Sequence, residues 1–295
     1  MDSTKILWEK HDAALKNREL SEGPVQQSLL DLKIELATRM QTNCQLCEHK
    51  CQVNREKKEG ICKVTTPRIS SEFLHTGEEF LFVPSHTVFF SGCTFQCVFC
   101  QNWEISQIKT GIYISQAYMV KRIIERNLQG SRNVNWVGGD PTPNILYIFQ
   151  TLKELNEPIP QIWNSNMYCS IETMNLLRGV IDVYLADFKF GRDRCAKYLS
   201  NTKEYLKDIT RNLLQSSHQG DLLIRHLIVP NHVSCCSLPI ITWMHTHLKH
   251  IPFNIMDQYR PCYKAKNISA INRSVTSSEY ETVMKAAVEK GLTIL

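Results

Sequence analysis

Residues 87–102 read TVFFSGCTFQCVFCQN, a short apolar run that passes directly into three closely spaced cysteines. The β-branched and aromatic residues at its start predict a buried strand. Cys93, Cys97 and Cys100 would then lie in the loop that follows the strand. In α/β barrels the working residues lie on loops that leave the C-terminal ends of strands. The stretch therefore predicts a strand of a parallel sheet and a reactive site at its end.

Further short apolar runs follow, separated by amphipathic helical stretches, which is typical of βα units on a parallel sheet. We expect strands at residues 87–91, 134–137, 162–164, 183–187, 222–229 and 253–256. One intervening helix is expected to be capped by Ser115, to end at Gly130 and to turn Leu128 toward the sheet. The last helix is expected over residues 277–290. Six units cannot fill an eight-unit barrel, so the predicted fold class is α/β, a partial (β/α)6 TIM-like barrel.

The chain before this repeat predicts an N-terminal helical, cysteine-rich extension. Residues 4–20 and 24–42 have helical patterns, the second opening at Pro24. Four cysteines follow. The expected domains are N-terminal helices over residues 1–42, a four-cysteine metal-binding module over 43–70, and the core barrel over 71–295.

The overall composition suits one large domain with an appendage. Of 295 residues, 43% are hydrophobic and 21% charged, which argues against disorder or a fibrous repeat. The net charge of +5 is mild and no basic run dominates, so we do not expect a nucleic-acid partner. No segment reaches the roughly 18 apolar residues of a membrane span, and we expect a cytoplasmic protein.

Twelve cysteines are best explained in a reducing compartment as metal ligands or catalytic thiols. Cys93, Cys97 and Cys100 have no obvious fourth partner. A complete [4Fe-4S] site takes four thiolates, so three imply a cluster with one iron left open for chemistry. The alternatives are a zinc site completed by His75 or His86, and a buried cysteine cluster.

The CxxxCxxC spacing, with the aromatic Phe99 before its third cysteine, resembles the hallmark of radical SAM enzymes. The resemblance implies that the open iron of the [4Fe-4S] cluster binds S-adenosyl-L-methionine. It also implies reductive cleavage of that molecule to methionine and a 5′-deoxyadenosyl radical, with a flavodoxin- or ferredoxin-type reductant as a partner. The cofactor would carry the hard step, and the protein would orient it and exclude water.

A second motif, VGGDPTP, follows the second expected strand. Its glycines let the backbone approach a ligand closely, and its carboxylate can accept from an ammonium group. Radical SAM enzymes carry a GGE motif here for the methionyl amino group. The resemblance therefore implies cofactor binding by Gly138, Gly139 and Asp140. The alternative is an ordinary Gly-Asp-Pro turn.

Polar residues also gather at the ends of the next strands, where side chains commonly bind ligands. The segments WNSNMY, YLADFK and RHLIVP resemble those of pyruvate formate-lyase activating enzyme-like proteins, which are related to glycyl-radical-enzyme activases. That resemblance implies S-adenosyl-L-methionine binding by a further set, namely Ser165, Asn166, Asp187, Lys189 and Arg225. For Asp187 and Lys189 the alternative is an ordinary surface ion pair.

The N-terminal cysteines form a compact C-x2-C-x3-C-x10-C module of Cys44, Cys47, Cys51 and Cys62. Four thiolates suit either a second [4Fe-4S] cluster or a structural zinc, with a site free of metal as the third alternative. Gly60 would allow the turn that returns the fourth cysteine. The remaining cysteines are expected to be small buried apolar residues: Cys169, Cys195, Cys235, Cys236 and Cys262.

Together these motifs predict a radical SAM oxidoreductase that abstracts hydrogen from a substrate that the sequence does not identify. One hypothesis is a protein substrate, a glycyl radical enzyme partner, and another is a small molecule. A wide mouth would favour the protein and an enclosed pocket the small molecule. The alternative class is a non-catalytic iron–sulfur electron carrier or a zinc-binding interaction protein, which would have no need of a ligand cleft.

Overall fold

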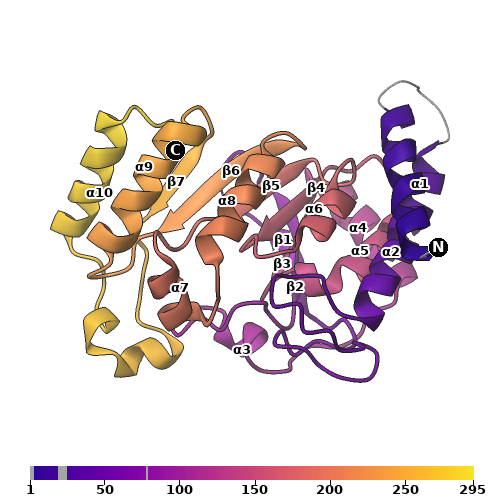
Figure 1. Cartoon of the computed structure of the whole chain (residues 1–295), viewed down its shortest axis with the longest axis horizontal. Coiled ribbons are helices and arrows are strands. Elements are labelled where there is room, and N and C mark those ends of the chain that lie inside the picture. The colour runs from indigo at the N-terminus through magenta and orange to yellow at the C-terminus, as the bar shows by residue number, and fades with distance from the viewer. Residues whose placement is uncertain (1–2, 19–24, 78) are drawn as a thin grey trace.

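The computed structural model describes residues 3–18, 25–77 and 79–295 (Figure 1). A seven-stranded sheet forms its centre, with the strands in the order β1 to β7. Six of them run parallel, each beside its successor. Their bounds are β2 Ser85–Phe90, β3 Val134–Gly138, β4 Gln161–Ser165, β5 Val183–Asp187, β6 Asp221–Leu227 and β7 Phe253–Met256. This order confirms the α/β partial (β/α)6 barrel, since β1 and β7 are the two edges of the described sheet.

Strand β1, Ile69–His75, was not expected from the sequence. It pairs antiparallel with β2, from Ile69 opposite Phe90 to His75 opposite Ser85. Of its seven residues Ile69 alone is fully buried. An edge strand that buries so little needs few apolar residues, so its sequence shows no clear strand pattern.

Helices follow each parallel strand and pack on the convex side of the sheet (Figure 1). Their bounds are α3 Trp103–Ser106, α4 Gln116–Leu128, α5 Ile145–Glu154, α6 Ile171–Leu177, α7 Asp193–Ser200, α8 Tyr205–Ser216, α9 Leu238–His247 and α10 Ser277–Glu289. Helix α4 begins as expected, because Ser115 accepts a hydrogen bond from the Tyr118 amide. The expected sheet contact of Leu128 is wrong, since that side chain is 83% exposed.

The N-terminal helices α1 (Ser3–Arg18) and α2 (Val25–Thr42) pack together at one end of the molecule, with α2 against α5 and α6 (Figure 1). The expected opening of the second helix at Pro24 lies outside the described residues. Lys33 of α2 is fully buried and donates from Nζ to the carbonyls of Leu176, at 2.8 Å, and Arg178, at 3.0 Å. These bonds satisfy carbonyl groups at the C-terminal end of α6.

Side chains alternate between the two faces of the sheet. Trp136, Trp163 and Tyr184 point toward the helices and are fully buried there. The opposite face holds a smaller apolar cluster of Ile162, Leu185 and Leu223. Phe82 packs against that cluster from the β1–β2 connection. We call residues 79–82 the plug, because Glu79 and Phe82 contact the concave side of the sheet.

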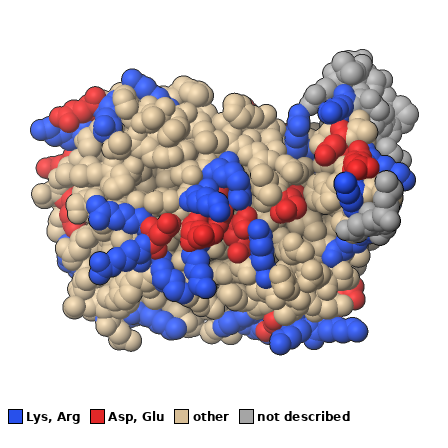
Figure 2. Space-filling model, viewed as in Figure 1, with Lys and Arg blue, Asp and Glu red and all other residues tan. Residues whose placement is uncertain are grey.

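Acidic and basic side chains intermingle over α7 and α8 on the face shown in Figure 2. Arg211 of α8 exemplifies this pairing, because its guanidinium lies 2.9 Å from a carboxylate oxygen of Glu48 and 3.2 Å from one of Asp208. Glu48 belongs to the cysteine module, so this ion pair ties the module to the barrel. No helix among the described residues is long and apolar enough to cross a membrane.

Candidate functional site

The three-cysteine loop leaves the C-terminal end of β2, as the sequence predicts. Cys93 and Cys97 are buried and Cys100 is half-buried. The loop is fixed to the end of α7, because the amides of Gln96 and Val98 donate to the carbonyls of Ser200 and Leu199. Two backbone hydrogen bonds to a helix end hold the loop in one conformation.

The thiols of this loop lie close enough to affect the pKa of Cys93 and of Cys97. Burial raises the pKa of Cys93 well above its usual value, and nearby Asp140, Cys97 and Cys100 raise it further. Burial and Cys100 raise the pKa of Cys97 to about 12, although the charge of Lys189 opposes the shift. A buried thiol with a raised pKa keeps its proton near neutral pH. It ionises when a metal cation takes the place of that proton, as in a metal centre.

Polar groups contact two of these sulfurs. The Phe95 amide donates to Cys93 Sγ at 3.3 Å, and Ser106 Oγ lies 3.2 Å from Cys100 Sγ, a contact in which either group can donate. Donors around thiolate ligands are the usual second layer of an iron–sulfur site. Three gathered thiols with such donors therefore fit a cluster that takes three protein ligands.

The zinc alternative fails on geometry. His86 lies near the start of β2 and His75 pairs with Ser85, so both rings lie at the strand end opposite the cysteine loop. His86 also donates to Glu72, with 2.9 Å between Nε2 and Oε2. Neither histidine can complete a site with Cys93.

Gly138 and Gly139 allow β3 to approach the cysteine loop. Gly138 has φ +110°, and a Cβ there would lie 2.1 Å from the Phe90 amide nitrogen. A Cβ on Gly139 would lie 2.0 Å from the carbonyl oxygen of Gly92. Backbone packing therefore excludes a side chain at both positions. The absence of side chains there would also let a ligand approach the backbone.

Asp140 is buried beside this contact and braces two loops. Its carboxylate accepts from the Thr142 amide at 2.9 Å, the Ser165 hydroxyl at 3.0 Å and the Asn166 amide at 3.2 Å. Burial raises the pKa of Asp140, and these hydrogen bonds oppose the shift. The Thr142 side chain also opposes the shift, so donors from Thr142, Ser165 and Asn166 surround this carboxylate.

Asn166 carries the same network to the cysteine loop. Its Nδ2 donates to the Thr94 hydroxyl at 2.8 Å and lies 3.7 Å from Cys93 Sγ. Asp140, Ser165 and Asn166, three residues predicted from different motifs, therefore form one connected network beside the first cysteine.

A second polar group lies on the concave side, at the ends of β4 to β6. Asp187 accepts from Lys189 Nζ at 2.6 Å and from Arg225 Nε at 2.9 Å. Arg225 also donates to Asn164 Oδ1 at 2.6 Å. Burial would raise the pKa of Asp187, but the charges of Arg225 and Lys189 outweigh it and the pKa is lowered. These residues form a half-buried network, which is more than the surface pair considered above.

Lys189 faces the cysteine loop. Burial would lower its pKa, but Asp187 and Cys97 raise it, so the ammonium group stays charged. A charged ammonium group beside Cys97 is suited to hold an anionic group of a ligand at this loop.

Two residues of this network, Glu79 and Asn254, were not identified from the sequence. Glu79 of the plug lies 3.8 Å from an Arg225 guanidinium nitrogen and accepts from the Asn254 amide at 3.1 Å. Its second carboxylate oxygen is buried and has no hydrogen-bond partner among the described residues. Glu79 follows an edge strand that the sequence does not reveal, so nothing there indicates that it reaches under β6.

The four-cysteine module folds into a tight set of turns. Cys44, Cys47 and Cys62 are buried and Cys51 is half-buried. A Cβ on Gly60 would lie 3.0 Å from Cys51 Sγ and 4.0 Å from Cys62 Sγ, so these sulfurs converge on that glycine. The backbone of Cys47 also pairs with the backbone of Cys169 in an isolated antiparallel β-bridge, which attaches the module to the barrel.

Arg55 is the buried cation of this module, with 1% of its surface exposed. Its guanidinium donates to Val64 O at 2.5 Å, to Pro143 O at 3.3 Å and to Cys44 Sγ at 3.8 Å. A buried guanidinium needs negative charge nearby, and four thiolates around a metal would supply it. The donor set therefore fits a metal centre.

The module contacts the three-cysteine loop directly. His49 Nε2 lies 2.7 Å from the Thr94 carbonyl oxygen. A Cβ on Gly92 would lie 2.6 Å from the Cys62 carbonyl oxygen, so the two cysteine segments pass each other at van der Waals distance. The two sets of thiols thus belong to neighbouring parts of one site.

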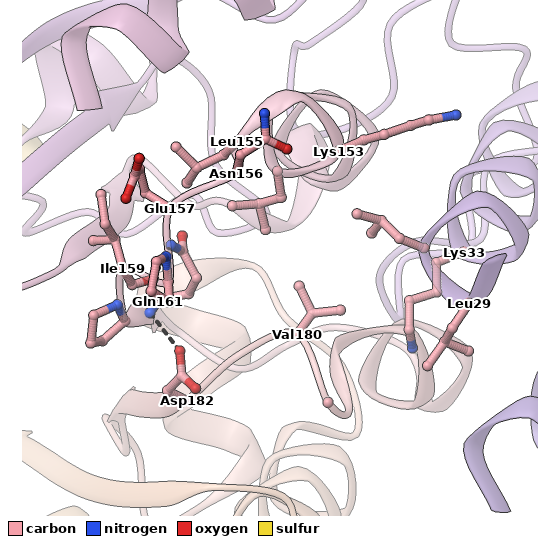
Figure 3. A pocket seen from close by; sticks show the side chains of 15 residues that line it. Leu29, Lys33, Lys153, Leu155, Asn156, Glu157, Ile159, Gln161, Val180 and Asp182 are labelled. Atoms are coloured by element: carbon pink, nitrogen blue, oxygen red, sulfur yellow. Dashed lines mark hydrogen bonds between the residues drawn. The ribbon is translucent and has the colours of Figure 1, made fainter. Parts of the chain in front are cut away.

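A cavity of 570 Å³ lies elsewhere, between α2 and the N-terminal ends of β4 and β5 (Figure 3). Leu29 and Lys33 border it on one side. On the other side the backbone amide of Gln161 donates to Asp182 Oδ2 at 2.7 Å. It opens at the strand ends opposite the cysteine loop and is not part of that site.

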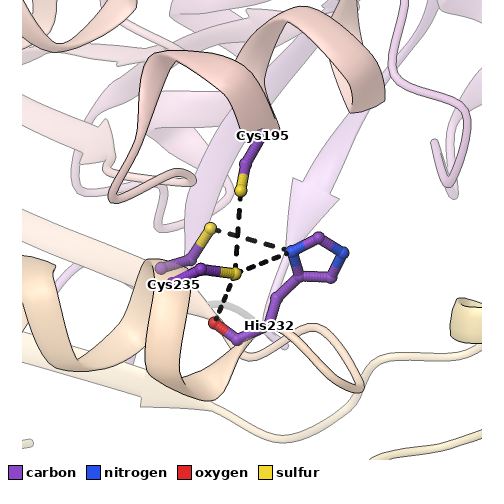
Figure 4. A group of neighbouring side chains, drawn as sticks. Cys195, His232 and Cys235 are labelled. Atoms are coloured by element: carbon purple, nitrogen blue, oxygen red, sulfur yellow. Dashed lines mark hydrogen bonds between the residues drawn. The ribbon is translucent and has the colours of Figure 1, made fainter.

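The structure also gathers three cysteines that were expected to be ordinary apolar residues. Cys195, Cys235 and Cys236 meet His232 with all ligand atoms within 4.8 Å of one another. Figure 4 shows Cys195, His232 and Cys235 turned toward a common point. His232, Cys235 and Cys236 lie within five positions of one another, but Cys195 is 37 positions from His232, so sequence spacing does not reveal the whole group.

Comparison with known proteins adds family information. Residues 87–232 match the family described as Radical SAM superfamily. The chain is 46% identical over 301 aligned positions to a Methanocaldococcus jannaschii protein with the name Uncharacterized protein MJ0674. The match covers 98% of this chain and 89% of that one.

Solved structures of two proteins are similar in part. Streptococcus suis SuiB bound to the precursor peptide SuiA is 10% identical, with a TM-score of 0.49 over 68% of this chain and 46% of SuiB. HydG, a maturase of the [FeFe]-hydrogenase, is 11% identical, with a TM-score of 0.48 over 100% of this chain and 63% of HydG. The chain thus spans less than half of SuiB and less than two thirds of HydG.

Proposed function

Because this chain belongs to the radical SAM superfamily, we propose that Cys93, Cys97 and Cys100 hold a [4Fe-4S] cluster whose fourth iron binds S-adenosyl-L-methionine. When bound, the pair supplies the electron transfer that yields methionine and a 5′-deoxyadenosyl radical able to take hydrogen from a substrate. The observation that carries the proposal is the gathering of three thiols, and no fourth, in a loop at the C-terminal end of β2.

The surrounding networks divide the binding task. Asp140, Ser165 and Asn166 keep the end of β4 against the loop, and the charge of the Asp140 carboxylate suits the methionyl amino group. Lys189 suits a carboxylate, and Asp187 keeps it charged and oriented. Arg225 fixes the other side of Asp187 and completes the concave wall. Gly138 and Gly139 leave no side chain between the wall and the loop.

We propose a second [4Fe-4S] cluster, rather than zinc, in the module of Cys44, Cys47, Cys51 and Cys62. A zinc ion at about 2.3 Å from each sulfur would hold them about 3.8 Å apart. In the part of the chain that the structure describes, these sulfurs are not gathered within 4.8 Å, and the wider spacing suits a four-iron group. Its place beside the catalytic loop suits electron transfer from a flavodoxin- or ferredoxin-type reductant.

For the substrate we propose a partner polypeptide, as in the glycyl-radical-enzyme activases. YLADFK and RHLIVP, which resemble the activase segments, supply Asp187, Lys189 and Arg225, and the structure joins these three in one network. The seven-stranded sheet does not close on itself in the described residues, since β1 and β7 are its two edges. A small-molecule substrate is the rival hypothesis.

The catalytic claim is tested by anaerobic reconstitution, assay of iron and sulfide, and measurement of 5′-deoxyadenosine after addition of S-adenosyl-L-methionine and dithionite. About eight irons per chain are expected for two clusters, and about four with one zinc would support zinc in the N-terminal module. Cys97→Ala should abolish product, whereas Cys262→Ala, a half-buried cysteine outside both clusters, should not. Cleavage that survives Cys97→Ala would refute the proposal, and electron transfer without cleavage would favour the carrier alternative.

The substrate class is tested with extract from cells grown in deuterated medium, divided by ultrafiltration. A protein substrate should transfer deuterium to 5′-deoxyadenosine only from the retained fraction. Transfer from the filtrate alone would identify a small molecule instead.

A further inference from the structure

The group of Cys195, His232, Cys235 and Cys236 has the spacing of ligands around a single metal ion. Cys195 and Cys235 have their sulfurs 3.6 Å apart, and His232 Nδ1 lies 3.2 Å from Cys235 Sγ and 4.0 Å from Cys236 Sγ. A tetrahedral zinc ion with bonds of about 2.3 Å to sulfur and about 2.0 Å to nitrogen places its ligands about 3.5 to 3.8 Å apart. The observed separations bracket those values.

The local backbone explains why the ligands converge. His232 ends the loop after β6, and Val233–Ser237 form one turn of π-helix before α9. That turn places Cys235 and Cys236 on the side of His232, while Cys195 approaches from α7. Short π-helical turns occur frequently at functional sites.

The group differs from both proposed cluster sites. Its ligand atoms all lie within 4.8 Å, which is too tight for a four-iron cube but suits one ion. The 3.6 Å between the sulfurs of Cys195 and Cys235 also exceeds the roughly 2.05 Å of a disulfide bond. A mononuclear metal site fits these separations better than a cluster or a disulfide.

The surroundings match the charge of such a site. Zinc with three thiolates and a neutral imidazole carries one net negative charge, since 2 − 3 = −1. A cavity of 760 Å³ opens beside Cys195, His232 and Cys235, and Arg192, Arg194 and Lys197 line it. Basic side chains around the ligands stabilise that charge, and the cavity gives an ion a way in.

We propose that Cys195, His232, Cys235 and Cys236 bind one structural zinc ion that fastens α7 to the turn after β6. The site acts at a distance on the reaction centre. The C-terminal residues of α7, Leu199 and Ser200, accept the backbone hydrogen bonds of the three-cysteine loop. A zinc ion at the other end of this helix therefore keeps the loop's support rigid.

The test is metal analysis of the full chain, purified from zinc-containing medium, in parallel with the double variant Cys195→Ser/Cys235→Ser. Cys262→Ser is the matched control, because it removes a half-buried cysteine that is not in the group. We expect the double variant to lose one zinc per chain with its iron content unchanged, and the control to lose none. Equal zinc in the two variants would overturn the proposal.

Two measurements keep the test decisive if the double variant folds poorly. X-ray absorption at the zinc edge of the wild-type protein should show imidazole together with sulfur ligands, and zinc without imidazole scattering would contradict the site. Hydrogen exchange of residues 193–200 should speed up at least tenfold when zinc is chelated, and unchanged exchange would refute the bracing role. Neither measurement depends on S-adenosyl-L-methionine cleavage, so failure of the zinc site and failure of the proposed function are separable.

Discussion

The side-chain amide of Asn166 donates a hydrogen bond to the sulfur of Cys93, with 3.7 Å between Nδ2 and Sγ. The bond joins the end of β4 to the loop after β2. If Cys93 is a cluster ligand, this amide disperses negative charge from the ligand and favours the reduced cluster. Asn166 would then tune the reduction potential while it positions the loop.

Asn166→Leu should therefore lower the reduction potential of the loop cluster and slow 5′-deoxyadenosine formation by about tenfold. The reason is that Cys93 loses its donor while a side chain of similar size fills the space. Redox titration followed by electron paramagnetic resonance measures the potential. Asn156→Leu, an exposed position at the opposite strand end, is the control. An unchanged potential in Asn166→Leu would show that the amide acts on the fold alone.

Gly139→Ala should disrupt the site because of a backbone clash. A Cβ there would lie 2.0 Å from the Gly92 carbonyl oxygen, next to Cys93, and backbone cannot move aside as a flexible side chain can. We expect loss of most of the cluster iron from the loop, measured after reconstitution.

Gly130→Ala is the comparison, since its φ of +98° is unfavourable for alanine, whereas Gly139 has no positive φ, and no described atom lies within 4 Å of the Cβ added at Gly130. It should cost about 1 kcal/mol of stability and leave iron binding intact. Equal iron loss in both variants would mean that the contact with Gly92 is not responsible.

His86 should make the protein less stable as the pH falls below 6.5. Burial lowers its pKa from 6.5 to about 4, although Glu72 opposes the shift, and its Nδ1 is buried without a partner. Between these pH values the His86 imidazole is protonated in the unfolded chain and neutral in the folded chain. The free energy of unfolding therefore decreases as the pH falls through that range.

The linkage predicts that about 1.4 kcal/mol is lost between pH 7.5 and pH 5.5 because of this residue. Urea unfolding of the wild type and His86→Gln at both pH values measures it as the difference between the two pH effects. Arg122 and Arg126, which also bind Glu72, are unchanged in the variant. The same pH effect in both proteins would exclude His86 as the source.

The parallel strands and the places of their polar ends followed from the sequence because each is a local pattern. An apolar run such as 183–187 must be buried on both faces. Its C-terminal end determines where Asp187 and Lys189 lie. Adjacent parallel strands then bring Arg225 to Asp187 without any further information. The order of strands in a barrel is thus sufficient to assemble that part of the site.

What the sequence missed depends on contacts between distant segments. Glu79 reaches Arg225 across 146 positions, and Cys195 meets His232 across 37, so neither has a spacing that indicates a site. The packing role of Gly139 depends on the close approach of two loops. Such contacts form only when distant segments meet in the folded chain, so no local sequence pattern predicts them.

Arg55→Met should weaken the N-terminal metal centre by roughly tenfold to a hundredfold while the chain still folds. Methionine fills much of the buried space but leaves the ligand Cys44 without its guanidinium and removes the positive charge beside Cys62. A four-thiolate centre would then be buried with uncompensated negative charge. Arg55→Lys is the intermediate case, because it retains the charge but cannot form three separate hydrogen bonds in the guanidinium geometry. Metal retained per chain after dialysis against a chelator should fall in the order wild type, Arg55→Lys, Arg55→Met. If all three retain the same metal, the charge of Arg55 has no part in holding the centre and serves only to join the module to Pro143.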